Sequence, residues 1–141
     1  ICGLDRSVIS DSLVHTDLKS GTNAEMGHGI SNADLANAPK WRDLWPTISA
    51  AFKSAKCFVA YNEKFDRRLI EQTNYNEDLP DPEIPPGIGD ELMIRFANWV
   101  GDWDAKWQHY KWHKLESGHR ALGDALAMID VLEKMAASEA C

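Results

Sequence analysis

The chain has 141 residues, which fits one domain, and its 44% hydrophobic and 26% charged residues are ordinary for a soluble globular protein. Its net charge of −7 argues against a protein that grips nucleic acid by broad electrostatic attraction, but not against an enzyme that reaches phosphates through carboxylate-bound metal ions. No apolar run approaches the ~20 residues of a membrane helix, and three cysteines without C-x-x-C spacing argue against a zinc site or a disulfide framework. We expect one cytoplasmic domain over residues 1–141, with no membrane partner.

The first third of the chain predicts strands followed by a helix. Residues 1–4 and 7–16 are expected to form two short strands joined at Asp5-Arg6. The run Ser31-Asn32-Ala33-Asp34 predicts a helix start, because Ser and Asp at this spacing can cap each other's backbone N–H groups.

The middle of the chain predicts helices around one buried strand. Residues 41–54 are expected to be helical, with Pro46 in the first turn or at a break. The apolar run 56–61 predicts a buried strand, followed by a helix over 65–72. Four prolines make residues 73–89 a loop.

The last third predicts two further helices and an aromatic stripe. Asp90 can cap a helix that runs to about Val100. A four-residue spacing would place three tryptophans on one helix face, for base stacking or, more simply, for packing: Trp99, Trp103 and Trp107. Residues 120–137 predict the last helix. Early strands with interleaved helices favour an α/β sandwich.

The strongest chemical motif is the N-x-x-F-D run at the end of the predicted strand 56–61. Asn62 can tie the turn, Phe65 can anchor the new helix in the core, and Asp66 then lies near the helix N-terminus. An ionised carboxylate there suits Mg²⁺ or Mn²⁺. Taken alone, Asp66 is more simply interpreted as an ordinary first-turn helix carboxylate.

A second motif, H-x-A-x-x-D, spans His119 to Asp124. On one helix these side chains would diverge by about 140°, so they converge only if His119 lies in the loop before the helix. Gly118 permits such a loop, and a loop histidine can serve as a general base. A chance pairing of a loop His with a helix-start Asp remains the alternative.

Together the two motifs resemble the second and third motifs of the DnaQ-like, or DEDDh, 3′→5′ exonucleases. Asn62, Phe65 and Asp66 match the former, and His119 and Asp124 with the intervening Ala match the latter. Weaker matches follow the family's order: Gly27-His28-Gly29-Ile30-Ser31 resembles H-G-I-[ST] near the substrate end, Ala38-Pro39-Lys40-Trp41 resembles A-P-x-aromatic, and Lys114-Leu115 resembles K-L.

The resemblance implies a ribonuclease-H-like mixed sheet flanked by helices and hydrolysis of phosphodiester bonds at the 3′ end of single-stranded DNA or RNA. It further implies that two Mg²⁺ or Mn²⁺ ions are held by Asp66 and Asp124, that His119 takes the proton from the attacking water, and that His28, Asn62 and Phe65 support the site. A protein partner such as a polymerase is also implied.

Two departures limit this interpretation. No strand carries the family's first motif, D-x-E; Asp81-Pro82-Glu83 has the spacing but lies in the proline-rich loop. We expect the first strand to lie upstream of Ile1 or to have been lost. Between Leu115 and His119 too few residues remain for the family's helix, so a segment there is either deleted or, as we favour, absent only from this sequence. The chain alone is therefore expected to be inactive or weak. The alternative hypothesis is a catalytically incomplete exonuclease fold that binds nucleic acid or a protein.

Overall fold

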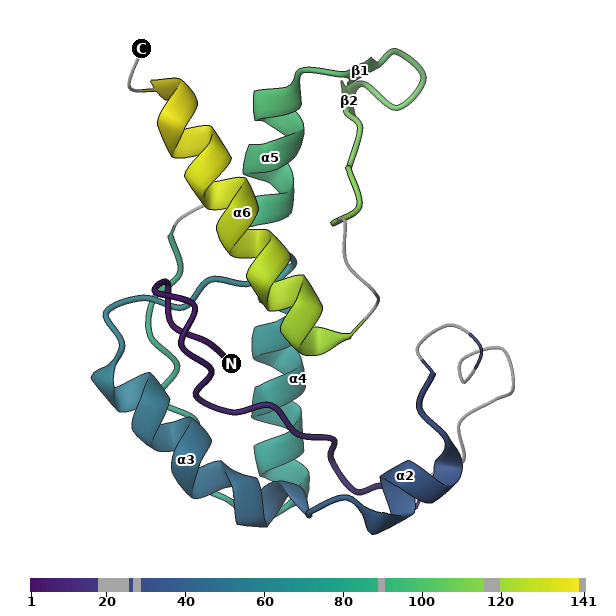
Figure 1. Cartoon of the computed structure of the whole chain (residues 1–141), viewed down its shortest axis with the longest axis vertical. Helices are drawn as coiled ribbons and strands as arrows, with labels where there is room; N and C mark the ends of the chain where they lie inside the picture. The colour runs from purple at the N-terminus through teal and green to yellow at the C-terminus, as the bar shows by residue number, and fades with distance from the viewer. Residues whose placement is uncertain (18–25, 27–28, 89–90, 116–119, 140–141) are drawn as a thin grey trace.

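The computed structural model describes residues 1–17, 26, 29–88, 91–115 and 120–139 (Figure 1). Its elements are α2 (Asn32–Asn37), α3 (Trp41–Ser54), α4 (Glu63–Asn76), α5 (Leu92–Val100), β1 (Trp103–Asp104), β2 (His109–Tyr110) and α6 (Ala121–Glu139). Since these five described helices accompany an antiparallel strand pair, the α/β class is confirmed in its coarse form. None of the helices in the described ranges is long and apolar enough to span a membrane.

The two strands expected at the N-terminus are reduced to a turn. A single antiparallel bridge joins Cys2 to Val8, and Arg6 adopts a positive φ of 65° between them. The rest of the predicted strand 7–16 is irregular in the structure. Two ion pairs from Arg6 fasten this turn to α6, through Asp130 at 2.7 Å and Glu133 at 2.8 Å.

The predicted start of α2 is confirmed, whereas the expectation for Pro46 is wrong. Ser31 accepts a hydrogen bond from the Asp34 N–H, and the Asp34 carboxylate accepts from the Ser31 N–H, which completes a capping box. Pro46 lies well inside α3, beyond the first turn, and the helix continues to Ser54. The ring only removes the N–H that would bond to the carbonyl of Arg42, and the aromatic and aliphatic contacts of α3 hold the helix on both sides.

The main core lies between α3 and the segments that follow it. Trp45, Ile48 and Phe52 are buried along one face of α3. Partly buried side chains pack around them from α3 itself, from α4 and from the flanking loops: Trp41, Leu44, Phe58, Ile70, Leu79 and Ile84. The fully buried Asn74 joins α3 to the proline-rich loop, because it accepts from Trp41 Nε1 at 2.7 Å and donates to the Pro80 carbonyl at 2.8 Å. The loop is thereby part of the packed structure.

The predicted strand 56–61 has no strand partner in the described part of the chain. Residues 57–60 are irregular in the structure, Ala60 is buried, and the Phe58 N–H donates to the carbonyl of Pro86 at 3.0 Å. The chain thus passes along the proline-rich loop here instead of joining a sheet. The ribonuclease-H-like mixed sheet remains a prediction.

The expectation of a continuous tryptophan face is wrong, because α5 ends before Trp103. Gly101 has a φ of 76°, a left-handed conformation that glycine adopts without strain, and it ends the helix at Val100. The chain then forms the β1–β2 hairpin, in which Trp103 pairs with Tyr110. Asp90, the expected cap of α5, lies outside the described residues; Glu91 occupies the cap position without a side-chain hydrogen bond.

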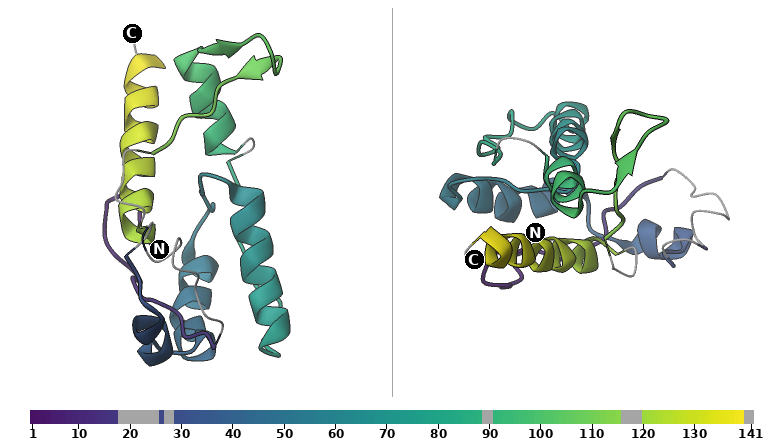
Figure 2. Two further views of the ribbon diagram at one scale, coloured as in Figure 1. Left: turned by 90° about the vertical axis from the view of Figure 1, so that its right-hand side faces the viewer. Right: turned by 90° about the horizontal axis from the view of Figure 1, so that it is seen from above.

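The helices α5 and α6 pack beside each other at the opposite end of the long axis from α3, as Figures 1 and 2 show. Leu92 and Ala97 of α5 and Ala127 and Ile129 of α6 are buried. Trp99 Nε1 donates to Ser138 Oγ at 2.7 Å, which fixes the far ends of the two helices. The last helix is close to the predicted range 120–137, and it places Asp124 in its first turn.

Candidate active site

The N-x-x-F-D motif forms the capped start of α4, as the sequence predicts. Asn62 Oδ1 accepts a hydrogen bond from the Phe65 N–H at 3.3 Å, and the Asn62 carbonyl accepts from the Asp66 N–H at 3.1 Å. These bonds satisfy N–H groups that a helix start otherwise leaves without partners. Asn62 therefore fixes the backbone of the turn that presents Asp66.

Phe65 does not anchor the helix in the core, so this expectation is wrong. The ring is 50% exposed, and the Arg68 guanidinium lies 6.0 Å from its centroid. The face of α4 that packs inward carries Ile70 and Asn74, and Phe65 is five positions before Ile70, roughly 140° around the helix. Because Ile70 and Asn74 face the core, helix geometry points Phe65 away from the core.

Asp66 occupies a half-buried position in the first turn of α4. Burial raises the pKa of its carboxyl above the usual value, so the ionised form is disfavoured where it stands. No hydrogen bond or ion pair to its carboxylate is present among the described residues. A carboxylate in this state gains most from a nearby cation, which is the environment that a divalent metal ion would provide.

The third motif is only partly within the described structure. Asp124 lies in the first turn of α6, and its N–H donates to the Arg120 carbonyl at 2.9 Å. His119, the predicted general base, lies outside the described residues, as does His28 of the H-G-I-S segment. Asp66 and Asp124 both occupy the fourth position of their helices, and Figure 1 shows both helices beginning near the middle of the long axis.

Contacts at the start of α4 tie the second motif to the segment that leads into the third. The Tyr61 hydroxyl donates to the carbonyl of His113, across 52 positions of sequence. The Met93 N–H donates to the Tyr61 carbonyl at 3.1 Å, and Lys64 pairs with Glu91 at 3.2 Å, so α5 begins at the same place. The start of α4, the start of α5 and the segment around His113 are therefore held together.

The H-G-I-S segment leads into α2, which lies within electrostatic reach of the third motif. Hydrogen bonds from Ser31 are the main cause of a lowered pKa at Asp34, and the charge of Arg120 adds to the effect. Arg120 directly precedes α6. The charge of Arg120 at the start of α6 is therefore felt at the first turn of α2, although the two segments are far apart along the chain.

Sequence reasoning missed Tyr61 and His113 as residues of this region. The His113 ring packs edge-on against Phe96 at 5.8 Å, and its Nε2 is buried without a partner among the described residues. Neither residue belongs to a motif with a characteristic spacing, and their contact joins distant segments. A single sequence carries no signal for such a pair.

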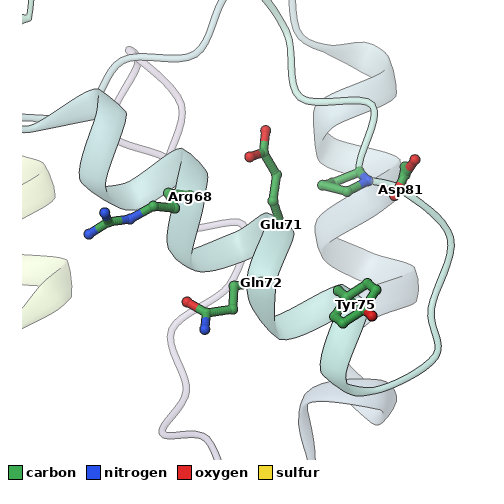
Figure 3. Close-up of a pocket in the computed structure, with 6 residues that line it drawn as sticks. Arg68, Glu71, Gln72, Tyr75 and Asp81 are labelled. Carbon is green, nitrogen blue, oxygen red and sulfur yellow. The ribbon is translucent and has the colours of Figure 1, made fainter.

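A direct ligand cluster is not formed by the described residues alone. No group of three or more His, Cys, Asp or Glu side chains there could hold a metal ion. The D-x-E run of the proline-rich loop lies elsewhere: Asp81 lines an open depression beside the later turns of α4 (Figure 3). The other residues of that depression are Arg68, Glu71, Gln72, Tyr75 and Pro82. Asp81 is therefore placed apart from the capped turn of Asp66.

One known protein is similar to nearly the whole chain. A protein of Escherichia phage 186 named an uncharacterized exonuclease is 29% identical over 154 residues, covering 95% of this chain and 78% of the phage protein. Because the match is longer than 141 residues, the phage protein contains residues within it that this chain lacks. No family model matches the chain. No solved structure gives a significant match.

Proposed function

We propose that this protein is a metal-dependent 3′→5′ exonuclease of the DnaQ-like type with a ribonuclease-H-like fold. It hydrolyses phosphodiester bonds at the 3′ end of single-stranded DNA or RNA and releases nucleoside monophosphates. The observation that carries the proposal is Asp66: a half-buried carboxylate with a raised pKa on a capped helix start, next to the chain that leads into the H-x-A-x-x-D motif. The named activity of the phage relative points to the same chemistry.

In this proposal each motif residue has one task. Asp66 and Asp124 would hold Mg²⁺ or Mn²⁺, and such ions would supply positive charge against the phosphate and make the attacking water more acidic. His119 accepts the proton from that water as general base. Asn62 keeps the first turn of α4 rigid, so that Asp66 does not move when it is charged. His28 would lie near the substrate end.

Two carboxylates are too few to hold a pair of metal ions firmly. The proposal therefore includes a first D-x-E strand that supplies the other two. The segments of the described structure that would flank this strand support the idea: residues 1–4, 7–16 and 57–60 are largely unpaired, although the sequence favours strands there. The residues that the phage relative has in excess agree with a further missing segment.

The test is release of nucleotides from a 5′-labelled single-stranded oligonucleotide by the full-length protein with Mn²⁺. We expect products that shorten from the 3′ end, background release by Asp66→Asn and Asp124→Asn, and a loss of about 10²–10⁴-fold by His119→Ala. Asp81→Asn is the matched control, since it removes a carboxylate of the D-x-E run in the loop, and it should keep full activity. Unchanged release by the Asp66 and Asp124 variants contradicts the proposal.

The second candidate is a binding module without catalysis. It is favoured by the lack of a three-ligand cluster within the described ranges. It predicts that the full-length protein retains an oligonucleotide or a partner protein such as a polymerase, and that neither Mn²⁺ nor Asp66→Asn alters this retention. Release of nucleoside monophosphates that depends on His119 rules it out.

A further inference from the structure

The six tryptophans fall into two groups that differ in their surroundings. Trp45 is buried in the α3 core, Trp41 is partly buried against that core, and Trp99 is partly buried with its Nε1 bonded to Ser138. The other three lie on the β1–β2 hairpin and just after it. They are exposed, with relative accessibilities of 49% for Trp103, 64% for Trp107 and 63% for Trp112. We call residues 103–112 the aromatic hairpin. Large aromatic side chains gathered on an exposed element mark an interaction surface.

Hydrogen bonds fix the backbone turn at the tip of the aromatic hairpin. Asp104 Oδ1 accepts from the N–H groups of Lys106 and Trp107 at 2.9 and 3.2 Å, and the Asp104 carbonyl accepts from the Gln108 N–H at 2.9 Å. Gln108 has a positive φ of 55° and donates from its side chain to the Ala105 carbonyl. The tip that carries Trp107 is therefore ordered before any ligand binds, which lowers the entropy lost on binding.

The ring faces themselves are arranged for stacking. Lys106 Nζ lies 4.9 Å from the centroid of the Trp107 ring. Trp112 stacks on His109 at 5.6 Å with an interplanar angle of 18°, so one ring face is already covered and the other is open. Trp103 is different, since it packs edge-on against Tyr110 at 5.1 Å and supports the hairpin. Trp107 and Trp112 are the two rings with a face to offer.

The charge of this segment is opposite to that of the whole chain. From Trp103 to Lys114 there are three lysines and two histidines but a single acidic residue, Asp104, in a chain with net charge −7. Lysines beside exposed aromatic rings are the combination that binds single strands: the cations contact phosphates, and the rings stack on bases. Lys111 is already paired with Asp102 at 3.1 Å, just before this segment, so the positive charge that remains to attract phosphate is that of Lys106 and Lys114.

The aromatic hairpin is connected to the candidate site by the chain itself. The segment after β2 turns back along α5 toward the level at which α6 begins (Figures 1 and 2). On the way, the His113 carbonyl is held by Tyr61 at the start of the second motif. A nucleic acid strand that stacks on Trp107 and Trp112 can therefore follow this segment toward the start of α4, where Asp66 lies.

We propose that the aromatic hairpin is a stacking platform for the unpaired bases of the nucleic acid strand, upstream of the 3′ end that enters the site. This rests on the proposed exonuclease function. Trp107 and Trp112 each stack on a base, and Lys106 contacts the phosphates beside Trp107. The platform accepts any base, because every base has a ring face, and it selects single strands, because duplex bases are already stacked.

The test uses binding without turnover. Anisotropy of fluorescein-labelled dT20 is measured with the full-length protein in EDTA, for the wild type and for Trp107→Ala, Trp112→Ala and Tyr75→Ala. We expect each tryptophan variant to weaken binding about ten-fold. Tyr75→Ala is the matched control, since Tyr75 is an 82% exposed aromatic on α4 away from the hairpin, and it should bind normally. Trp107 makes no core contact, so its variant should retain the wild-type Tm.

A kinetic experiment separates the platform from the proposed function. With Mn²⁺, Trp107→Ala should raise KM for dT20 about ten-fold but leave hydrolysis of thymidine 5′-(p-nitrophenyl phosphate) unchanged, because that ester is too short to reach the hairpin. Asp66→Asn should abolish both reactions. Equal binding of dT20 by the wild type and the tryptophan variants overturns the platform. That result is expected if the aromatic hairpin binds a protein partner instead of nucleic acid. A wild type that cleaves neither substrate overturns the exonuclease, whatever the binding result.

Discussion

The α3 core and the aromatic hairpin use the same residue type in opposite ways. Trp45 and Trp41 lie on α3 with ring centroids 5.7 Å apart, next to the buried Phe52, whereas Trp107 and Trp112 are exposed on a hairpin. The difference follows from the backbone. A helix repeats every 3.6 residues and brings side chains four apart onto one face, while a tight turn points them outward. Tryptophan therefore marks a core in one region and a surface for a ligand in the other.

Deletion of one aromatic ring from each region should give the largest contrast. Phe52→Ala empties the centre of the α3 core, where Trp45 and Phe58 pack edge-on at 6.4 and 5.7 Å, and should lower the free energy of unfolding by about 3–5 kcal/mol. Trp107→Ala should change it by less than about 0.5 kcal/mol, because the ring is mostly exposed. Urea unfolding of both variants measures this. Comparable losses would show that the hairpin is structural.

The buried amide of Asn74 offers a second, smaller test of the core. Asn74→Ala leaves Trp41 Nε1 and the Pro80 carbonyl without partners, so we expect a loss of about 2–3 kcal/mol. Asn76→Ala is the matched control, the same change on the exposed side of the same helix, and should be nearly neutral. If the two variants unfold at the same urea concentration, the proline-rich loop is not part of the core.

The same contrast explains how much could be predicted from the sequence. The helix α2, the cap at Asn62 and the placement of Asp66 and Asp124 in first helical turns follow from local capping and periodicity, and all are present. The loop of prolines is also present, but it begins later than the predicted residue 73, because α4 continues to Asn76. These features depend on residues within a few positions of one another. Local rules therefore located the parts of the chain that carry the candidate chemistry.

Some errors are local, such as the place of Pro46 inside α3 and the end of α5 at Gly101, but the others arise where distant parts of the chain decide the outcome. The tryptophan spacing suggested one helix face, but Gly101 ended α5 first. Phe65 was assigned to the core, but Ile70 and Asn74 fixed the opposite rotation of α4. The segments predicted as strands lack pairing partners in the described chain, and a strand forms only with a neighbour. The Tyr61–His113 contact had no local signal at all.

Asp66 belongs neither to the α3 core nor to the aromatic hairpin. It lies in the first turn of α4, a helix whose Ile70 packs against the α3 core. Burial raises its pKa, so the folded state binds a proton more readily than the unfolded chain, and stability falls as pH rises from about 3.8 through the raised value. Asp66→Asn should remove this pH dependence. It should also raise the free energy of unfolding at pH 7 in EDTA, by less than about 1 kcal/mol because solvent reaches the carboxyl.

Metal provides the control for that prediction. Mn²⁺ should raise the Tm of the wild type, because it binds the folded protein alone, and should have no effect on Asp66→Asn. A variant that is less stable than the wild type at pH 7 would show that Asp66 has a structural role. A variant that keeps the full Mn²⁺ shift would place the metal elsewhere.

The smallest effect is expected for Arg6, which links the N-terminal turn to α6 as an exposed contact outside both regions. Its guanidinium reaches Asp130 and Glu133 at 2.7 and 2.8 Å, and hydrogen bonds from it to these two carboxylates raise its pKa. Because all three side chains are well exposed, water and salt screen most of the attraction. Arg6→Ala should therefore lower Tm only slightly at low salt and not at 1 M NaCl. A large loss of Tm that persists in high salt would mean that interactions other than charge hold the turn against α6. Exposure would then be a poor guide to how much a contact stabilises this protein, and the same doubt would apply to the small effect predicted for Trp107.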